Sequence, residues 1–193
     1  MRPRSPLAAL LVLAAGCSRT PPPEPLPSLG AVPPFSFVSE QGTPVTAATF
    51  AGSIWIADFV FLRCSGTCPQ MTAKMAALAE QLASEKRIRF VSFDVDPAHD
   101  SVADLAAHAK ALGADPARWT FVRGETEPVR ALVRSGFKLG LEEGKPGDPE
   151  PILHSTRFVL VDAKGTIRGY YDALEPDAFR KLSSDALRLA REG

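Results

Sequence analysis

The 193-residue sequence predicts an α/β domain with a central mixed sheet flanked by helices. Runs rich in β-branched and aromatic residues, at Ile54–Phe61, Ile88–Val95 and Trp119–Val122, are separated by stretches of helical apolar spacing. A hairpin signal and a last amphipathic helix follow near the C-terminus. Because helical crossovers favour parallel pairing and hairpins are antiparallel, we expect a parallel centre with antiparallel strands at one side.

The first strands of the domain carry turn signals at their ends. Phe35–Val38 alternates and then meets Gln41-Gly42, which indicates an N-terminal strand and a turn, and Pro44–Thr46 follows as a possible partner. Ile54–Phe61 is nearly continuous apolar, as in a central strand buried on both faces. Asp58 alone interrupts that run, so it lies near a strand edge or has a buried partner.

The period changes from strand to helix after this central run. Met71, Met75, Leu78 and Leu82 recur at helical spacing, and Pro69 suits the first turn, where a missing N–H costs nothing. The two methionines are soft potential metal ligands, but their helical spacing favours core packing. The sequence therefore predicts a core-facing helix directly after the second of two cysteines.

The remaining elements follow from capping and turn residues. Asp100 or Ser101 is expected to cap a helix that Gly113 ends. In chain order we further expect a short helix over Glu127–Ser135, an extended Phe137–Leu141, a loop over Glu142–Pro151, a single strand over Leu153–Val161, a turn at Asp162–Gly165, a returning strand over Thr166–Tyr171 and a last helix over Pro176–Arg191.

The N-terminus has the features of an export signal. Arg2 and Arg4 precede a short apolar stretch, Leu7–Ala15, which is too short to span a bilayer comfortably. Small residues before Cys17 resemble the lipobox of bacterial lipoproteins, in which the cysteine carries the lipid. The alternative is an ordinary secretory signal in which Cys17 is an incidental thiol.

These features divide the chain into three segments. We expect a lipoprotein signal peptide over residues 1–16, a Pro-rich tether over 17–31 and a folded domain over 32–193. The protein would then be exported and lipid-anchored, with its domain facing the periplasm or the cell exterior. The formal net charge is zero and no Lys/Arg run occurs, which argues against nucleic acid as a partner.

Two thiols remain once Cys17 is set aside. Cys64 and Cys68 are separated by three residues, so a disulfide between them would close almost no loop and add little stability. The start of the following helix favours a thiolate at Cys68, and Arg63 could do the same for Cys64. The pair is therefore expected to be reactive, either in binding a metal or in cycling with a disulfide.

The donor set favours a soft metal. Two thiolates prefer Cu(I) or Zn, and an added imidazole broadens the choice to Cu(II). A structural zinc site normally needs four protein ligands, which argues against that option. Our hypothesis is that His154 is the third ligand, although a single histidine at a strand start is more often an ordinary core or surface residue.

Three motifs in order resemble the Sco/SenC family of copper-binding, thioredoxin-like proteins. The first is Phe59-x4-Cys64-x3-Cys68-Pro69, and the second begins Val91-Ser-Phe-Asp-Val-Asp96-Pro97 and ends Asp100-Ser101. The third is Leu153-His154-Ser-Thr-x5-Asp162-x2-Gly165. The resemblance covers about Val32–Ala190. The chain departs from the family in having Leu153 where members usually carry Asp, and in lacking the common Pro-Asp pair between the cysteines.

The resemblance implies a thioredoxin-like fold with copper, as Cu(I) or Cu(II), held by Cys64, Cys68 and His154. It places Asp96 beside these ligands, although Asp96 could instead cap its own loop. It implies delivery of copper to the copper-A centre of cytochrome c oxidase, or reduction of that centre's cysteines. Expected partners are the oxidase subunit with that centre, and another copper chaperone or a thiol reductase.

Delivery of copper is not enzymatic turnover, so the resemblance leaves the question of an enzyme open. The alternative reading is an enzyme, either a thiol–disulfide oxidoreductase acting on exported proteins or a thioredoxin-like peroxidase. In that case Cys64 and Cys68 are the catalytic redox pair, and His154 has little to do.

Overall fold

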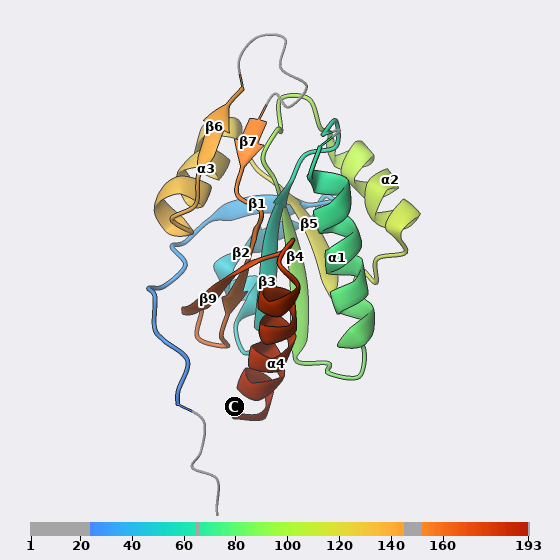
Figure 1. Cartoon of the computed structure of the whole chain (residues 1–193). Helices are drawn as coiled ribbons and strands as arrows, with labels where there is room; N and C mark the ends of the chain where they lie inside the picture. The colour runs from blue at the N-terminus through green and yellow to red at the C-terminus, as the bar shows by residue number, and fades with distance from the viewer. Residues whose placement is uncertain (1–23, 65, 145–151, 193) are drawn as a thin grey trace, which may run out of the picture.

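A seven-stranded mixed sheet runs through the domain in the computed structural model, which describes residues 24–64, 66–144 and 152–192 (Figure 1). The three central strands are parallel, and the two strands at each side continue the sheet antiparallel. Across the sheet the strands are β2 (Pro44–Thr46), β1 (Ser36–Ser39), β5 (Trp119–Arg123), β4 (Ile88–Asp94), β3 (Ile54–Val60), β8 (Arg157–Val161) and β9 (Ile167–Asp172).

Different elements cover the two faces of the sheet. One face packs against three helices, α1 (Cys68–Gln81), α2 (Val102–Leu112) and α4 (Pro176–Glu192). The other face packs against the short elements η1 (Ala47–Phe50), α3 (Thr126–Ala131), the π-turn η2 (Leu132–Gly136) and the hairpin of β6 (Leu141–Glu143) and β7 (Ile152–His154). The elements that bear the cysteines and the histidine therefore approach from opposite faces.

The central strand β3 is buried on both faces, as the sequence predicts. Trp55, Ala57 and Phe59 lie in the core on the α3 side, and Ile54 and Ile56 lie in the core under the helices. Successive side chains of a strand alternate between faces, so this continuous apolar run requires cover on both sides.

The helix boundaries predicted from capping residues are confirmed. The Ser101 hydroxyl accepts the Asp104 N–H at 3.2 Å, and Gly113 ends α2 in the left-handed conformation with φ 67°. Helix α1 begins at Cys68, with Pro69 in its first turn.

The expectation of one continuous strand over Leu153–Val161 is wrong. The chain forms β7 and β8, which are separated at Ser155 and Thr156, and β7 pairs with β6 outside the main sheet. The Ser155 hydroxyl accepts the Arg157 N–H at 3.2 Å. Local side-chain bonds of this kind compete with the hydrogen bonds between strands and favour a turn. His154 therefore lies on a small side hairpin.

The extended segment predicted over Phe137–Leu141 is also largely wrong. Phe137 closes the π-turn η2, and Lys138 has a φ of 55°, so only Leu141 belongs to a strand. Burial of the Phe137 ring in the aromatic core takes precedence over the local β preference.

The predicted tether is docked on the domain from Glu24 onward. Leu26 is buried, and the backbone of Leu29 donates to Ile167 at 2.9 Å along the edge of β9. Arg168 donates to the carbonyl oxygens of Leu26 and of Pro27, the latter at 2.7 Å. The folded unit therefore starts before Val32. The predicted signal peptide over residues 1–16 and the predicted lipid site Cys17 lie outside the described residues.

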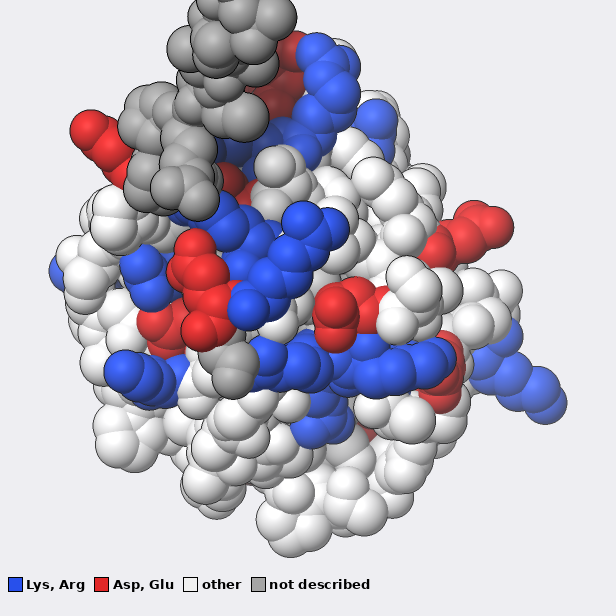
Figure 2. Space-filling view, turned by 90° about the horizontal axis from the view of Figure 1, so that it is seen from below, with Lys and Arg blue, Asp and Glu red and all other residues white. Residues whose placement is uncertain are grey.

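Figure 2 views the end of the domain at which this N-terminal segment docks, and Lys and Arg side chains form a band across that end. Among the residues that the structure describes, no helix has the length and apolar character needed to cross a bilayer.

Arg168→Ala should loosen the docked N-terminal segment. The side chain bonds to two carbonyl oxygens and, at 2.9 Å, to the Asp162 carboxylate, so we expect a loss of roughly 1–3 kcal/mol in the free energy of unfolding. Amide hydrogen exchange at Leu29 should accelerate as well. Arg180→Ala is the matched control, because Arg180 is exposed and far from this segment. Unchanged exchange at Leu29 would show that Arg168 does not hold it.

Candidate metal centre

The two cysteines lie where the central strand gives way to a helix. Cys64 is in the loop after β3 and is partly buried, whereas Cys68 opens α1 and is 4% exposed. Within the described chain both are free thiols. The prediction that Cys64 precedes the helix in a loop is confirmed.

His154 reaches the inner cysteine from the opposite face. Its Nε2 lies 3.0 Å from the Sγ of Cys68, 86 residues away in sequence. Its Nδ1 lies 3.1 Å from the Ser155 carbonyl oxygen, which can only accept, so Nδ1 carries the hydrogen. The lone pair of Nε2 therefore faces the sulfur and accepts a hydrogen bond from the Cys68 thiol. A histidine that binds metal through Nε2 uses the same tautomer.

The β6–β7 hairpin sets the position of this imidazole. Leu141 pairs with His154, and the side chains of Leu141 and Ile152 are buried in the aromatic core. The ring of Phe61, which ends the central strand, meets the His154 ring edge to face at 5.7 Å. The histidine is thus held by packing from both its own hairpin and the cysteine loop.

The electrostatics of Cys68 oppose the expected thiolate. Burial raises the pKa of Cys68 well above its usual range, and a hydrogen bond and charge repulsion from Cys64 raise it further. Proximity to the start of α1 does not overcome this desolvation. In the metal-free protein Cys68 is a neutral thiol, and a metal cation must displace its proton on binding.

Asp58 is a second buried group that favours its neutral form. It is fully buried, and neither of its carboxyl oxygens accepts a hydrogen bond of good geometry from a described residue. Burial raises its pKa to about 7, and the nearby Ser92 hydroxyl offsets only part of the increase. Asp58 also contributes to the raised pKa of Cys68, so its charge acts on the cysteine site.

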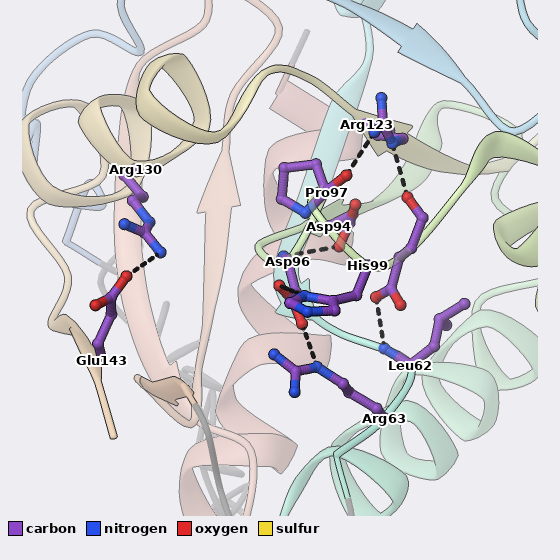
Figure 3. A network of polar contacts seen from close by, with 10 residues as sticks. Leu62, Arg63, Asp94, Asp96, Pro97, His99, Arg123, Arg130 and Glu143 are labelled. Carbon is purple, nitrogen blue, oxygen red and sulfur yellow. Dashed lines mark hydrogen bonds and ion pairs between the residues drawn. The ribbon is translucent and has the colours of Figure 1, made fainter. Parts of the chain in front are cut away.

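Arg63 does not bond to Cys64, whose thiolate it was predicted to stabilise. Its Nε donates to Asp96 at 2.5 Å, and the same carboxylate accepts His99 Nδ1 at 2.8 Å (Figure 3). Asp96 is buried, and its carboxylate oxygens bond to these two side chains. The sequence placed Asp96 near the metal ligands without direct contact to the metal, and in the structure Asp96 reaches the cysteine loop through Arg63, the neighbour of Cys64.

A second hydrogen bond ties the cysteine loop to the loop after β4. The Leu62 N–H donates to the Asp100 carboxylate at 2.8 Å, and Arg123 Nε donates to the Asp100 carbonyl oxygen at 2.7 Å (Figure 3). The sequence suggested Asp100 only as a helix cap. The Asp-Pro-x2-Asp spacing was the sequence signal that could have indicated this contact with Leu62. It places the carboxylates of Asp96 and Asp100 on one loop.

A cavity of about 230 Å³ opens beside the cysteines between α1 and α2. Both sulfur-bearing residues line it, together with Leu62, Pro69 and His108. Burial lowers the pKa of His108, so its imidazole is neutral at pH 7. Sequence patterns did not single out His108, because it lies on a helix of ordinary amphipathic spacing.

The site has the ligand types of a soft metal centre, but the ligands are not already arranged around one point. Among the described residues no three or more His, Cys, Asp or Glu side chains already surround a common point. Cys68 and His154 contact each other directly. Two sulfurs and an imidazole lone pair nevertheless form a donor set that suits copper.

Comparisons of the sequence and the fold with known proteins show the family of this chain. The chain matches the protein-family model described as SCO1/SenC over residues 25–184. It is 30% identical over 156 residues to the SCO1 protein homolog of Bacillus subtilis, which covers 80% of each chain. The fold is thioredoxin-like, as the resemblance implied.

Solved structures agree with this placement. A SCO1/SenC family lipoprotein from Bacillus anthracis has a TM-score of 0.77 at 29% identity, covering 84% of this chain and 97% of that one. BsSco, described with a disulfide switch and as a member of the Sco family of cytochrome c oxidase assembly proteins, has a TM-score of 0.73 at 28% identity, with 86% and 98% covered. The chain belongs to the SCO1/SenC family.

A more distant structure shares the fold. ScoI of Bradyrhizobium japonicum, solved with copper bound, has a TM-score of 0.70 at 14% identity and covers 83% of this chain and 99% of that one.

Asp58→Asn should stabilise the protein in a pH-dependent way. The folded-state pKa of Asp58 is raised from 3.8 to about 7, so ionising it lowers stability progressively as the pH rises between these values. The variant should match the wild type at about pH 4 and exceed it by roughly 1–3 kcal/mol at about pH 8 in urea unfolding. Asp177→Asn, at an exposed position, is the control. A stability difference independent of pH would contradict the assignment.

Proposed function

We propose that this protein binds copper through Cys64, Cys68 and His154. In this proposal it either delivers the ion to the copper-A centre of cytochrome c oxidase or maintains the thiols of that centre. The contact of 3.0 Å between Cys68 Sγ and His154 Nε2 carries the proposal, because it joins a remote imidazole to the cysteine pair. The copper-bound state of a distant relative and the role of BsSco's family in oxidase assembly support it.

The three donors have complementary roles in this proposal. The two sulfurs supply the soft ligands that Cu(I) prefers, and the imidazole widens the site to Cu(II). Cys68 and His154 form the buried side of the site, and their proton is released when a cation takes its place. Cys64, on a partly buried loop, is the side from which an ion can pass to a partner.

Thiol–disulfide exchange is the alternative function, and one observation favours it. Both cysteines are free thiols in the described structure, adjacent, and bordered by an open cavity. Oxidation of the pair to one disulfide releases two electrons and two protons, which can reduce one disulfide of a partner protein. Cys64 is the more accessible thiol and would attack first, and Cys68 would resolve the mixed disulfide.

The location of the protein is part of the proposal. Lipid attached at Cys17 would hold the domain at a bacterial membrane, facing the periplasm or the cell exterior, as the lipoprotein relative of Bacillus anthracis suggests. The partners are then the oxidase subunit with the copper-A site, and a second copper chaperone or a thiol reductase.

His154→Ala should weaken copper binding selectively. Removing the imidazole leaves two sulfurs, so we expect Cu(II) affinity to fall by at least about 10-fold and Cu(I) affinity to fall less. Competition titrations with each ion and the Cu(II) absorption spectrum provide the measurement. His99→Ala is the matched control, because that imidazole bonds to Asp96 away from the sulfurs. Unchanged affinity and spectrum in His154→Ala would remove His154 as a ligand.

Single cysteine variants should show which thiol attacks a disulfide and which thiol resolves the mixed disulfide that forms. With oxidised glutathione as the probe, Cys68→Ser should accumulate a mixed disulfide on Cys64, because the resolving thiol is missing. Cys64→Ser should accumulate little, because Cys68 is buried and its pKa is raised. Mass spectrometry of the intact chain measures the adduct. Adduct formation mainly in Cys64→Ser would reverse the assigned order.

A further inference from the structure

The end of the domain opposite the cysteines, here called the base, is defined by strand direction. The cysteine loop follows the C-terminal end of β3, so the base is formed by the N-terminal ends of β3 and β4. Trp55 near the start of β3 pairs with Val161, so the β8–β9 turn lies there too. Arg87, which precedes β4, donates to Ala190 near the end of α4 at 2.7 Å. The cysteine loop and the base occupy opposite ends in Figure 1.

Basic side chains outnumber acidic ones at the base. Six of them are here called the basic surface and come from the segment before β4, the β8–β9 turn, the start of β9 and the end of α4: Lys86, Arg87, Lys164, Arg168, Arg188 and Arg191. Arg89 and Arg118 also lie at this end and donate to carbonyl oxygens. The acidic residues of the base are Glu24, Glu80, Glu85, Asp115, Asp162 and Glu192, of which Asp162 pairs with Arg168 and Glu192 lies 3.8 Å from Arg188.

Backbone carbonyls hold most of these guanidinium groups. Arg87 donates to Ala190, and Arg188 donates to the Glu24 carbonyl oxygen at 2.9 Å. A carbonyl fixes the position of a guanidinium but does not neutralise its charge. Lys86, Lys164 and Arg191 are exposed, and their side chains bond to no other described residue. The base therefore keeps a positive potential.

The cysteine end carries charges of both signs. Its exposed carboxylates belong to the loops and helix starts around the site: Asp104, Glu125, Glu127, Glu142, Glu143 and Glu175. Exposed cations lie there too, at Arg63, Arg134 and Arg157, and Arg130 pairs with Glu127 and Glu143. This end therefore lacks the excess of cations found at the base, and a domain with its positive charge at one end turns that end toward an anionic surface.

The N-terminal chain leaves the domain at the positive end. Glu24, the first described residue, is held there by Arg188, and the next residues are held by Arg168. Cys17 is only seven positions before Glu24, so any surface attached at Cys17 is brought close to the base.

We propose that the base rests on an anionic lipid surface and that the cysteine end faces away from it. The proposal rests on the proposed lipid anchor at Cys17. Anionic lipid attracts Lys and Arg side chains within about a Debye length, roughly 8 Å at physiological salt, and repels the carboxylates of the other end. The copper site is then presented to a partner protein at a fixed side of the membrane.

Lysine footprinting of the acylated full-length protein in nanodiscs tests this orientation. Amine labelling at Lys86 and Lys164 should be slower by about fivefold on phosphatidylglycerol than on phosphatidylcholine, while Lys74 and Lys138, which lie away from the base, serve as internal references. The protection should disappear at roughly 0.5 M NaCl, because the attraction is screened. Equal labelling on the two lipids, or protection that resists salt, would overturn the proposal.

A charge-reversed variant tests the surface itself. Lys164→Glu combined with Arg191→Glu should restore labelling of Lys86 on phosphatidylglycerol, and Arg157→Glu combined with Arg180→Glu, distant from the base, should not. Both pairs change the charge equally at exposed positions. Protection of Lys86 that survives the first pair, or that appears only on adding an acidic protein, would refute the lipid contact.

Vesicle flotation distinguishes failure of the lipid contact at the base from failure of the proposed lipid anchor at Cys17. A chain that does not float with vesicles contradicts acylation at Cys17. In that case the unacylated chain is mixed with phosphatidylglycerol vesicles and labelled. Protection of Lys86 and Lys164 then still shows whether the base binds lipid.

Discussion

The contact between the sulfur of Cys68 and the imidazole of His154 depends on two anchors that are built separately. One is the end of β3, which places the cysteine loop, and the other is the β6–β7 hairpin, which is held by Leu141 and Ile152 in the aromatic core. Neither anchor alone brings the two groups together. The site therefore exists only when both faces of the sheet are packed.

Burial gives this site its chemical character. Cys68 and Asp58 both favour their neutral forms, because each is desolvated and lacks a positive partner among the described residues. The nearest cation in sequence, Arg63, is held by Asp96. The proposed copper ion would supply the missing positive charge and would lower the pKa of the groups around it.

Local patterns were sufficient for much of the fold and for part of the site. The buried strand β3 follows from its continuous apolar run, and α2 follows from Ser101 and Gly113 at its ends. The break at Ser155 and the docking of Leu26 were not predicted. At the break, the local bond between Ser155 and Arg157 is combined with the pairing of β7 to β6, which a single apolar run does not reveal. The docking of Leu26 depends on Arg168, which is distant in sequence, and a proline-rich composition gives no sign of that contact.

By itself, the sequence determined that a cysteine pair stands at a strand-to-helix junction, because the apolar period changes there within a few residues. Its three motifs also determined the family. Only the tertiary structure decided that His154 meets Cys68, that Arg63 turns to Asp96 and that Cys68 is a neutral thiol. The physical reason is that contacts between distant segments and the desolvation of a thiol are properties of packing, and packing is not local in the chain.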